Sequence, residues 1–189
     1  MKNITYKITF FSEWHCGSGL TSGSDLDALV IKDKDRFPFV PGKTLKGLIR
    51  EAAEEIFGED SEIIKELFGH FDEKRVGESN SHSKGTAFFS DATISTGLKS
   101  KVDKELVGLF YRGFSSTAIM ANGIAEAHSL RKLETTIPCE LIATIIGIDD
   151  QYVGDLTNCM QWIKRLGQNR HRGLGRCKFE ILDIKEANQ

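Results

Sequence analysis

The segment from His15 to Arg50 constrains this chain of 189 residues more than any other part. It begins with a loop rich in Gly and Ser that carries two acids, Asp25 and Asp27. Two short apolar runs follow, separated by a charged turn, and the sequence Pro-Gly-Lys-Thr then opens an amphipathic helix. A loop of this composition needs backbone freedom rather than packing. We therefore expect the apolar runs and the helix to be the ordered parts around it.

Apolar periodicity predicts a mixed α+β fold. Apolar and polar residues alternate near the N-terminus as in a half-buried strand, and the apolar residues of two later segments keep helical spacing. The predicted order is β-α-β-β-α-β with insertions, which suits a ferredoxin-like sheet with both helices on one face. The RNA recognition motif has this fold, and its open sheet face is free for a ligand. The predicted segments are 4–10, 45–56, 86–94, 135–148, 156–166 and 177–181.

Length and composition indicate one domain, 1–189, with a hydrophobic content of 40% that is sufficient for a core. The four cysteines are far apart and form no C-x-x-C pair, so a zinc site is not expected. The N-terminus lacks the apolar region of a signal peptide, and no apolar run reaches membrane-spanning length. We expect a cytoplasmic protein in a reducing compartment, without membrane contact.

The charges are unevenly distributed although the net charge is only −2. Between Asp155 and Glu180 there is no acid, whereas acids crowd the segment 51–66. A polyanion would be attracted to the first region and repelled by the second, unless both are merely solvated faces. The basic residues of the first region are Lys164, Arg165, Arg170, Arg172, Arg176 and Lys178.

The loop 167–176, with the sequence GQNRHRGLGR, is the strongest candidate for RNA binding. Glycines let backbone N–H groups approach phosphates, and arginines hold phosphates in a forked geometry. A plain glycine-rich turn is the alternative, but it would not need three arginines and a histidine. We favour RNA binding, with Arg170, His171, Arg172, Gly173, Gly175 and Arg176 as the contacting residues.

The helix start at Gly42-Lys43-Thr44 is not a nucleotide-binding P-loop, because Phe37 stands where such a loop needs glycine. Free N–H groups at the helix start can still grip a phosphodiester, with Lys43, Lys46 and Arg50 nearby. Simple helix initiation is the alternative.

Several of these motifs together resemble the RAMP superfamily, the repeat-associated proteins of CRISPR effector complexes. They are the His-x-Gly loop at His15, the run L-D-A-L-V-I-K-D, the helix start P-G-K-T-L-K-G and the glycine-rich loop at 172–176. The nearest resemblance is to the backbone subunit of the type III (Csm and Cmr) complexes. It implies that Lys43, Thr44 or Lys46 contacts guide RNA. It also implies that His15, with the loop glycines Gly17 and Gly19, takes part in RNA binding.

The resemblance assigns target-RNA cleavage to Asp27, with Asp25 as the fallback. A carboxylate can hold a divalent ion, Mg²⁺ or Mn²⁺, against the scissile phosphate, or align the 2′-hydroxyl for attack. One carboxylate alone is a poor metal site, so RNA would have to supply further ligands. The alternative is that each Asp merely caps or bends the loop.

The segment at about 113–138 resembles the thumb insertion of the family, which enters the guide–target duplex and displaces a base pair. The typical I-D-R core is replaced here by Ile119-Met120-Ala121-Asn122. Ile119 and Met120 would then serve as the apolar residues that separate bases.

These observations favour a CRISPR RNA-binding subunit that cleaves guide-paired target RNA. Its partners would be CRISPR RNA, target RNA and other effector subunits, including copies or relatives of itself. One alternative is a binding subunit without cleavage. Another is a guide-processing endoribonuclease that uses His15 as general base. A third is a small structural protein without RNA.

Overall fold

A computed structural model describes residues 1–23, 26–71 and 82–187. Its centre is an antiparallel sheet with the strand order β10-β1-β9-β6-β2, in which β5 also pairs with β9. The strands are β1 (Lys2–Phe10), β2 (Phe39–Val40), β5 (Phe88–Phe89), β6 (Ala92–Thr93), β9 (Glu140–Ile148) and β10 (Cys177–Glu186).

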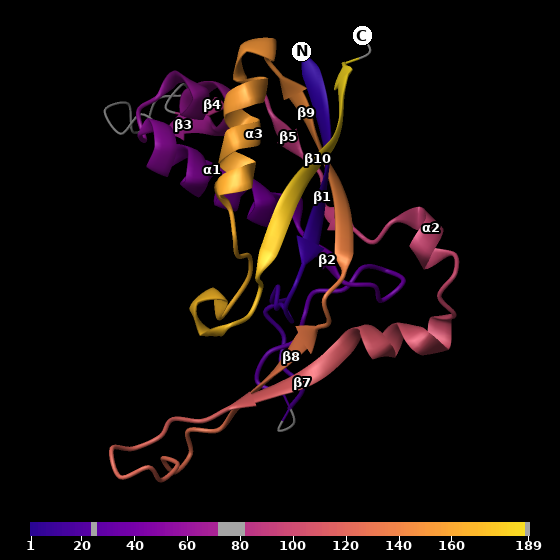
Figure 1. Ribbon diagram of the computed structural model, residues 1–189, viewed down its shortest axis with the longest axis vertical. Helices are drawn as coiled ribbons and strands as arrows, with labels where there is room; N and C mark the ends of the chain where they lie inside the picture. The colour runs from indigo at the N-terminus through magenta and orange to yellow at the C-terminus, as the bar shows by residue number, and fades with distance from the viewer. Residues whose placement is uncertain (24–25, 72–81, 188–189) are drawn as a thin grey trace.

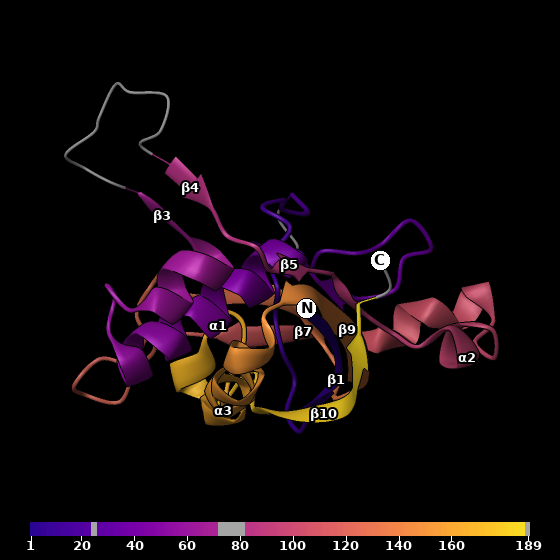
Figure 2. The same cartoon turned by 90° about the horizontal axis from the view of Figure 1, so that it is seen from above.

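Two helices, α1 (Gly42–Phe57) and α3 (Val153–Trp162), cover one face of this sheet (Figures 1 and 2). The alternation along β1 explains why, because Ile4, Tyr6 and Ile8 are fully buried and point to the helices. The helices bury the apolar residues of their own stripes against them, among them Leu45 and Leu156. The predicted α+β arrangement, with an antiparallel sheet and both main helices on one face, is confirmed.

The opposite face of the sheet is polar and its charges largely neutralise one another. Lys7 Nζ lies 3.0 Å from a Glu140 oxygen and 3.7 Å from Glu180, and Lys185 lies 2.8 Å from Asp183. Carboxylates beside lysines offer a polyanion little net attraction. RNA binding on this open face, which the fold leaves free for a ligand, therefore finds little electrostatic support.

The remaining elements are short. A hairpin of β3 (Gly69–Phe71) and β4 (His82–Lys84) follows the π-helix η1 (Ile64–Phe68). On the side of the sheet away from α1 and α3 lie α2 (Thr96–Lys99) and the 3₁₀-helix η3 (Lys104–Phe110) (Figures 1 and 2). Two further 3₁₀-helices are η4 (Asp150–Tyr152) and η5 (Arg170–Arg172).

A long hairpin of β7 (Tyr111–Ser116) and β8 (Arg131–Thr136) projects from one end of the molecule (Figure 1). We call residues 111–136 the thumb, since they fall in the segment of the predicted insertion. The single strand expected over 135–148 is wrong, because the chain leaves β8 and starts β9 after Pro138. Proline has no N–H to donate to a ladder, so it interrupts the strand.

The strand expected over 86–94 is likewise broken, into β5 and β6. Ser90 and Asp91 separate them. Ser90 binds β9 twice, since its N–H donates to the Thr144 carbonyl and its Oγ accepts from the Thr144 N–H. Within the described ranges, no helix is long and apolar enough to cross a membrane.

Candidate nucleic-acid interface

The segment after β1 joins the thumb to the glycine-rich loop. The Trp14 N–H donates to the Thr136 carbonyl at 3.0 Å, on β8. In the other direction, Gln168 N–H donates to the His15 carbonyl at 2.9 Å. Residues far apart in the sequence therefore meet at the end of the sheet from which the thumb projects (Figure 1).

A cleft of about 410 Å³ lies at this junction. It brings together five residues that the sequence proposed for RNA binding from separate motifs, from the His15 loop, the start of α1 and the basic loop. These five are His15, Gly17, Lys43, Thr44 and Arg170, and the other lining residues are Cys16, Gly47, Leu48, Glu51, Leu166, Gly167 and Gln168.

His15 is completely buried, and its ring is fixed by one hydrogen bond. Nδ1 lies 2.6 Å from the Glu134 carbonyl oxygen. A carbonyl only accepts, so Nδ1 carries a proton, and in the neutral form of the ring Nε2 would be an acceptor. Nε2 is buried and has no hydrogen-bond partner in the described part of the chain. A Cβ on Gly17 would lie 3.1 Å from this nitrogen, so a larger residue would crowd it.

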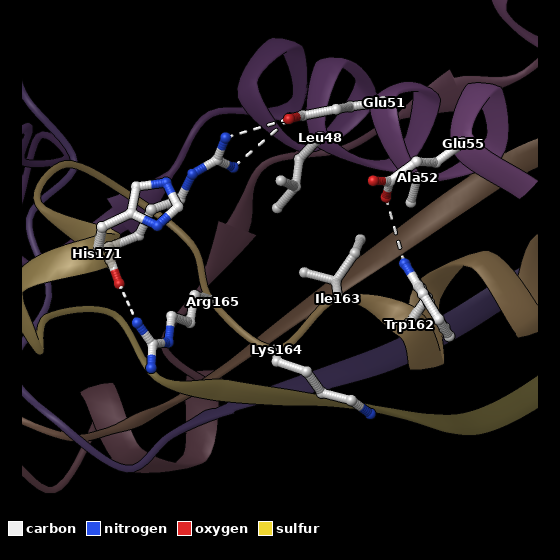
Figure 3. A pocket seen from close by; sticks show the side chains of 10 residues that line it. Leu48, Glu51, Ala52, Glu55, Trp162, Ile163, Lys164, Arg165 and His171 are labelled. Carbon is white, nitrogen blue, oxygen red and sulfur yellow. Dashed lines mark hydrogen bonds and ion pairs between the residues drawn. The ribbon is translucent and has the colours of Figure 1, made fainter.

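The acidic and basic runs of the sequence meet in a second, smaller cleft of about 220 Å³ (Figure 3). Arg170 reaches the Glu51 carboxylate on α1 with both terminal nitrogens, at 3.1 and 3.5 Å. Trp162 Nε1 donates to Glu55 at 3.3 Å, and Arg165 donates to the Arg170 carbonyl at 2.6 Å. An incoming phosphate would therefore compete with Glu51 for Arg170.

The other basic residues of the loop point to different surfaces. Arg172 lines a cleft of about 440 Å³ with Arg131 and with hydroxyl residues at and beyond the outer end of the thumb strands. Arg176 lies over the ring of Phe11, 5.7 Å from its centroid. His171 is exposed and lines the smaller cleft (Figure 3). A bound strand would have to follow a curved surface to contact them all.

The glycines of the loop have different roles. Gly175, at φ 69°, donates its N–H to the Glu13 carbonyl at 2.7 Å, and a Cβ there would lie 1.9 Å from the Leu166 oxygen. Gly167, which the sequence reasoning did not single out, is similarly pressed against the His15 carbonyl. Gly173 has open space around it. The packing of the chain explains Gly175, and phosphate approach stays a prediction for Gly173.

Replacing Gly175 with alanine is expected to destabilise the fold by about 2 to 5 kcal/mol. A positive φ costs an L-residue about 1–2 kcal/mol, and overpacking adds about 1–3 kcal/mol. Gly173→Ala is the matched control, because Gly173 also has a positive φ but meets no atom within 4 Å. Thermal melts of both variants should separate the two effects. Equal melting temperatures would show that the contact with Leu166 is unimportant.

Asp27 is exposed and lies beside the outer part of the β7–β8 ladder of the thumb, at Lys132. Its N–H donates to the Lys132 carbonyl at 2.7 Å, and its Oδ2 accepts from the Lys132 N–H at 2.8 Å. Within the described ranges, Oδ1 has no hydrogen-bond partner and could accept from a ligand. Asp25 lies outside the described residues. Nowhere in the described ranges do three or more His, Cys, Asp or Glu side chains gather as a metal site would require.

Some residues proposed from the sequence do not line the main cleft. Lys46 lies on another flank of α1, where burial and then the nearby Arg50 lower the pKa of its ammonium group. Arg50 donates to Glu54 at 2.6 Å and to the Gly69 carbonyl at 3.5 Å. Gly19 lies in the exposed loop with φ 79°.

The far end of the thumb exposes apolar side chains. Ile119 is 62% exposed, Met120 43% and the neighbouring Ile124 61%. Exposed apolar residues at the tip of a projecting hairpin indicate a surface that meets another molecule. Their role in separating bases stays a prediction.

The match to known proteins extends over nearly the whole chain. The sequence model of the RAMP superfamily matches residues 7–178. The chain belongs to the RAMP superfamily. The described clefts and the thumb therefore lie within a RAMP protein, and every residue proposed for its site falls inside the matched range.

Relatives of this RAMP protein are found by sequence and by structure. It is 27% identical over 223 aligned positions to the "CRISPR system Cms endoribonuclease Csm3" of Streptococcus thermophilus, covering 97% of this chain and 96% of the relative. A chain from the "Type III-B Cmr-beta bound to cognate target RNA" superposes with a TM-score of 0.69 at 11% identity, covering 95% and 96% of the two chains. A chain of the apo Cmr-beta gives 0.66 at 12% identity, with 95% and 97% covered. These structures share the fold.

Proposed function

We propose that this RAMP protein is a CRISPR RNA-binding subunit of a type III effector ribonucleoprotein and that it cleaves target RNA paired with the guide. One observation carries the proposal: Asp27 is bonded to Lys132 of β8, within the thumb, at the same end of the molecule as the cleft of His15, Lys43 and Arg170. The names of the relatives support it. The strand order also suits a ferredoxin-like unit, in which β10, β1 and β9 correspond to its fourth, first and third strands.

The residues divide into those that hold the guide and one that acts on the target. Lys43, Thr44 and Arg170 would hold guide phosphates in the cleft, with Arg172 continuing this basic surface to the thumb. The apolar tip of the thumb would enter the duplex and unstack a base step. The strand distortion would then place a target phosphodiester beside the free oxygen of Asp27.

The proposed reaction is an internal transfer within the target RNA. The 2′-hydroxyl loses its proton and attacks the adjacent phosphorus, the bond to the 5′-oxygen breaks, and that oxygen takes up a proton as a 2′,3′-cyclic phosphate forms. Asp27 Oδ1 can accept a hydrogen bond from the 2′-hydroxyl and align it for attack. A divalent ion such as Mg²⁺ or Mn²⁺, if bound, would polarise the phosphate oxygens. Among the described residues, no group of three or more His, Cys, Asp or Glu includes Asp27, so oxygens of the RNA would supply further ligands.

A guide-processing endoribonuclease is a weaker candidate. His15 would have to act as general base, but its Nε2 is buried and its Nδ1 proton is committed to the Glu134 carbonyl. A base must reach the proton that it removes. A binding subunit without cleavage has the same clefts, and only an assay separates it from the proposed enzyme.

The direct test is to purify the chain with its partner subunits and ask whether a discrete small RNA accompanies it. Complementary RNA is then added, and the 3′ ends of the fragments are analysed. We expect a guide RNA of discrete length and target fragments whose 3′ ends carry a cyclic phosphate. If guide RNA is present but the target is not cleaved, the chain is a binding subunit without cleavage activity. Absence of RNA would contradict the proposal as a whole.

If Asp27 acts with a divalent ion, excess chelator should abolish target cleavage and leave guide binding unchanged. The phosphate contacts of the guide come from Lys43 and Arg170, which need no metal. Cleavage and guide retention can be measured in the same sample before and after chelation, with Mg²⁺ and Mn²⁺ added back separately. Cleavage that persists in chelator would remove the metal from the mechanism.

A further inference from the structure

Glu134 on β8 is a buried acid that neither the sequence motifs nor the proposed mechanism uses. Only 9% of its surface is exposed. Burying a carboxylate is costly unless it is paired and hydrogen-bonded. Here both oxygens have partners: Oε2 accepts from the Val30 N–H at 3.0 Å, and Oε1 accepts from Lys32 Nζ at 2.8 Å.

The backbone of Glu134 makes two further contacts with candidate functional segments. Its carbonyl oxygen receives the His15 ring at 2.6 Å, and its N–H donates to the Ala28 carbonyl at 2.9 Å. Glu134 therefore contacts the buried His15 of the main cleft on one side and the segment that follows Asp27 on the other.

The segment 27–30 runs parallel to residues 132–134 of β8. Asp27 is bonded at one end, through Lys132, and Val30 at the other end, through the Glu134 carboxylate. Lys32 extends this attachment, because its ammonium group also lies 4.0 Å from the centre of the Tyr111 ring on β7. The Asp27 segment is thus fixed to both strands of the thumb.

We propose that Glu134 is a positioning residue for target cleavage, which holds Asp27 in fixed register with the thumb through Val30 and Lys32. This inference rests on the proposed function. Productive attack needs the reacting groups in place to within a fraction of an ångström. Without the carboxylate, the segment keeps the bonds of Asp27 to Lys132 and of the Ala28 carbonyl to the Glu134 N–H, but Val30 and Lys32 lose their attachment to β8. The segment can then shift relative to the distorted target strand.

Two variants test the attachment from its two sides. Glu134→Gln keeps the shape but has one amide oxygen, so either the Val30 N–H or Lys32 loses its acceptor and faces the NH₂ group. Lys32→Met removes the ammonium group and keeps the apolar stem. Assembled complexes with each variant should cleave bound target at least about tenfold more slowly in single turnover. Guide content and target Kd should stay within about twofold.

Further variants separate positioning from general stability. The double variant should be no slower than the slower single variant, since both act on one attachment. Lys32→Arg keeps the charge and should restore most of the rate. Lys2→Met is the matched control, because Lys2 is 23% exposed, as Lys32 is 24% exposed, and it is ion-paired at the end of the sheet far from the thumb (Figure 1).

The outcomes are distinct. Wild-type cleavage rates in Glu134→Gln and Lys32→Met, with Asp27→Asn inactive, would overturn the inference and leave the proposed function intact. Loss of guide RNA from both variants would overturn it as well, because Glu134 would then be a residue of the fold alone. A wild-type complex that does not cleave would remove both proposals together.

Discussion

Replacing Asp27 with asparagine is expected to lower target cleavage by about a hundredfold or more, which corresponds to a few kcal/mol at the transition state. Asparagine keeps an oxygen that accepts from the Lys132 N–H, so the loop stays attached to β8. It loses the negative charge that would align the 2′-hydroxyl or hold a metal ion. Cleavage is measured in assembled complexes, with guide content and target affinity alongside.

Asp27→Ala gives a second comparison. It removes both the charge and the side-chain bond from the Lys132 N–H, which is worth about 0.5–1.5 kcal/mol, and keeps the backbone bond to the Lys132 carbonyl. The alanine variant should therefore melt slightly below the asparagine variant and cleave no faster. Asp25→Ala is the sequence-neighbour control and should cleave almost normally. If the asparagine variant cuts like wild type, the chain is a binding subunit or its active acid lies elsewhere. If all three variants fail equally, the loop as a whole matters rather than Asp27.

The second large effect is expected from changing Arg170, Arg172 and Arg176 together to alanine. Each phosphate contact with single-stranded RNA contributes about 0.7 to the slope of log affinity against log salt, so the slope should fall by about two. Affinity should decrease for every RNA sequence, since phosphate contacts carry no base information. Titrations at several salt concentrations, by fluorescence anisotropy of labelled RNA, measure both quantities.

The matched control removes the same charge from exposed lysines elsewhere, with Lys84, Lys101 and Lys104 changed to alanine. That variant should keep both the affinity and the slope nearly unchanged. The single arginine variants should also differ, because Arg170 is already bonded to Glu51 while Arg172 lines an open cleft by the thumb. An unchanged slope in the triple arginine variant would mean that the guide does not follow this loop.

The periodicity of apolar residues in the sequence is sufficient to predict the strands and helices that have one buried face. The alternation over Ile4 to Phe10 and the helical spacing from Leu45 to Ile56 predict β1 and α1 correctly. These elements have one clear apolar face, which is the signal that such patterns contain. The thumb lacks it, because β7 is largely exposed and rich in Gly and Ser, so its strands could not be recognised.

The candidate site was predicted only in part, because its geometry depends on contacts between distant residues. The motifs named His15, Lys43 and Arg170 separately, and the fold shows that they share a cleft. Glu134 and Lys32 are 102 positions apart, so no local pattern could pair them. The only signal was a single acid directly before a β-branched apolar segment. Likewise, the packing role of Gly175 against Leu166 is visible only once the helix and the last strand are in place.

The pairing of β1 has a consequence for the synthesis of the chain on the ribosome. β1 is made first, but its two partners, β9 and β10, are made last, with Lys2 opposite Glu186. At about 5–20 residues per second, the buried face of β1 waits roughly ten to thirty-five seconds for its neighbours. Pairings this distant in sequence also form slowly once the chain is complete. The nascent chain is therefore expected to depend on chaperones, and slower synthesis would prolong the exposure of β1 rather than assist its folding.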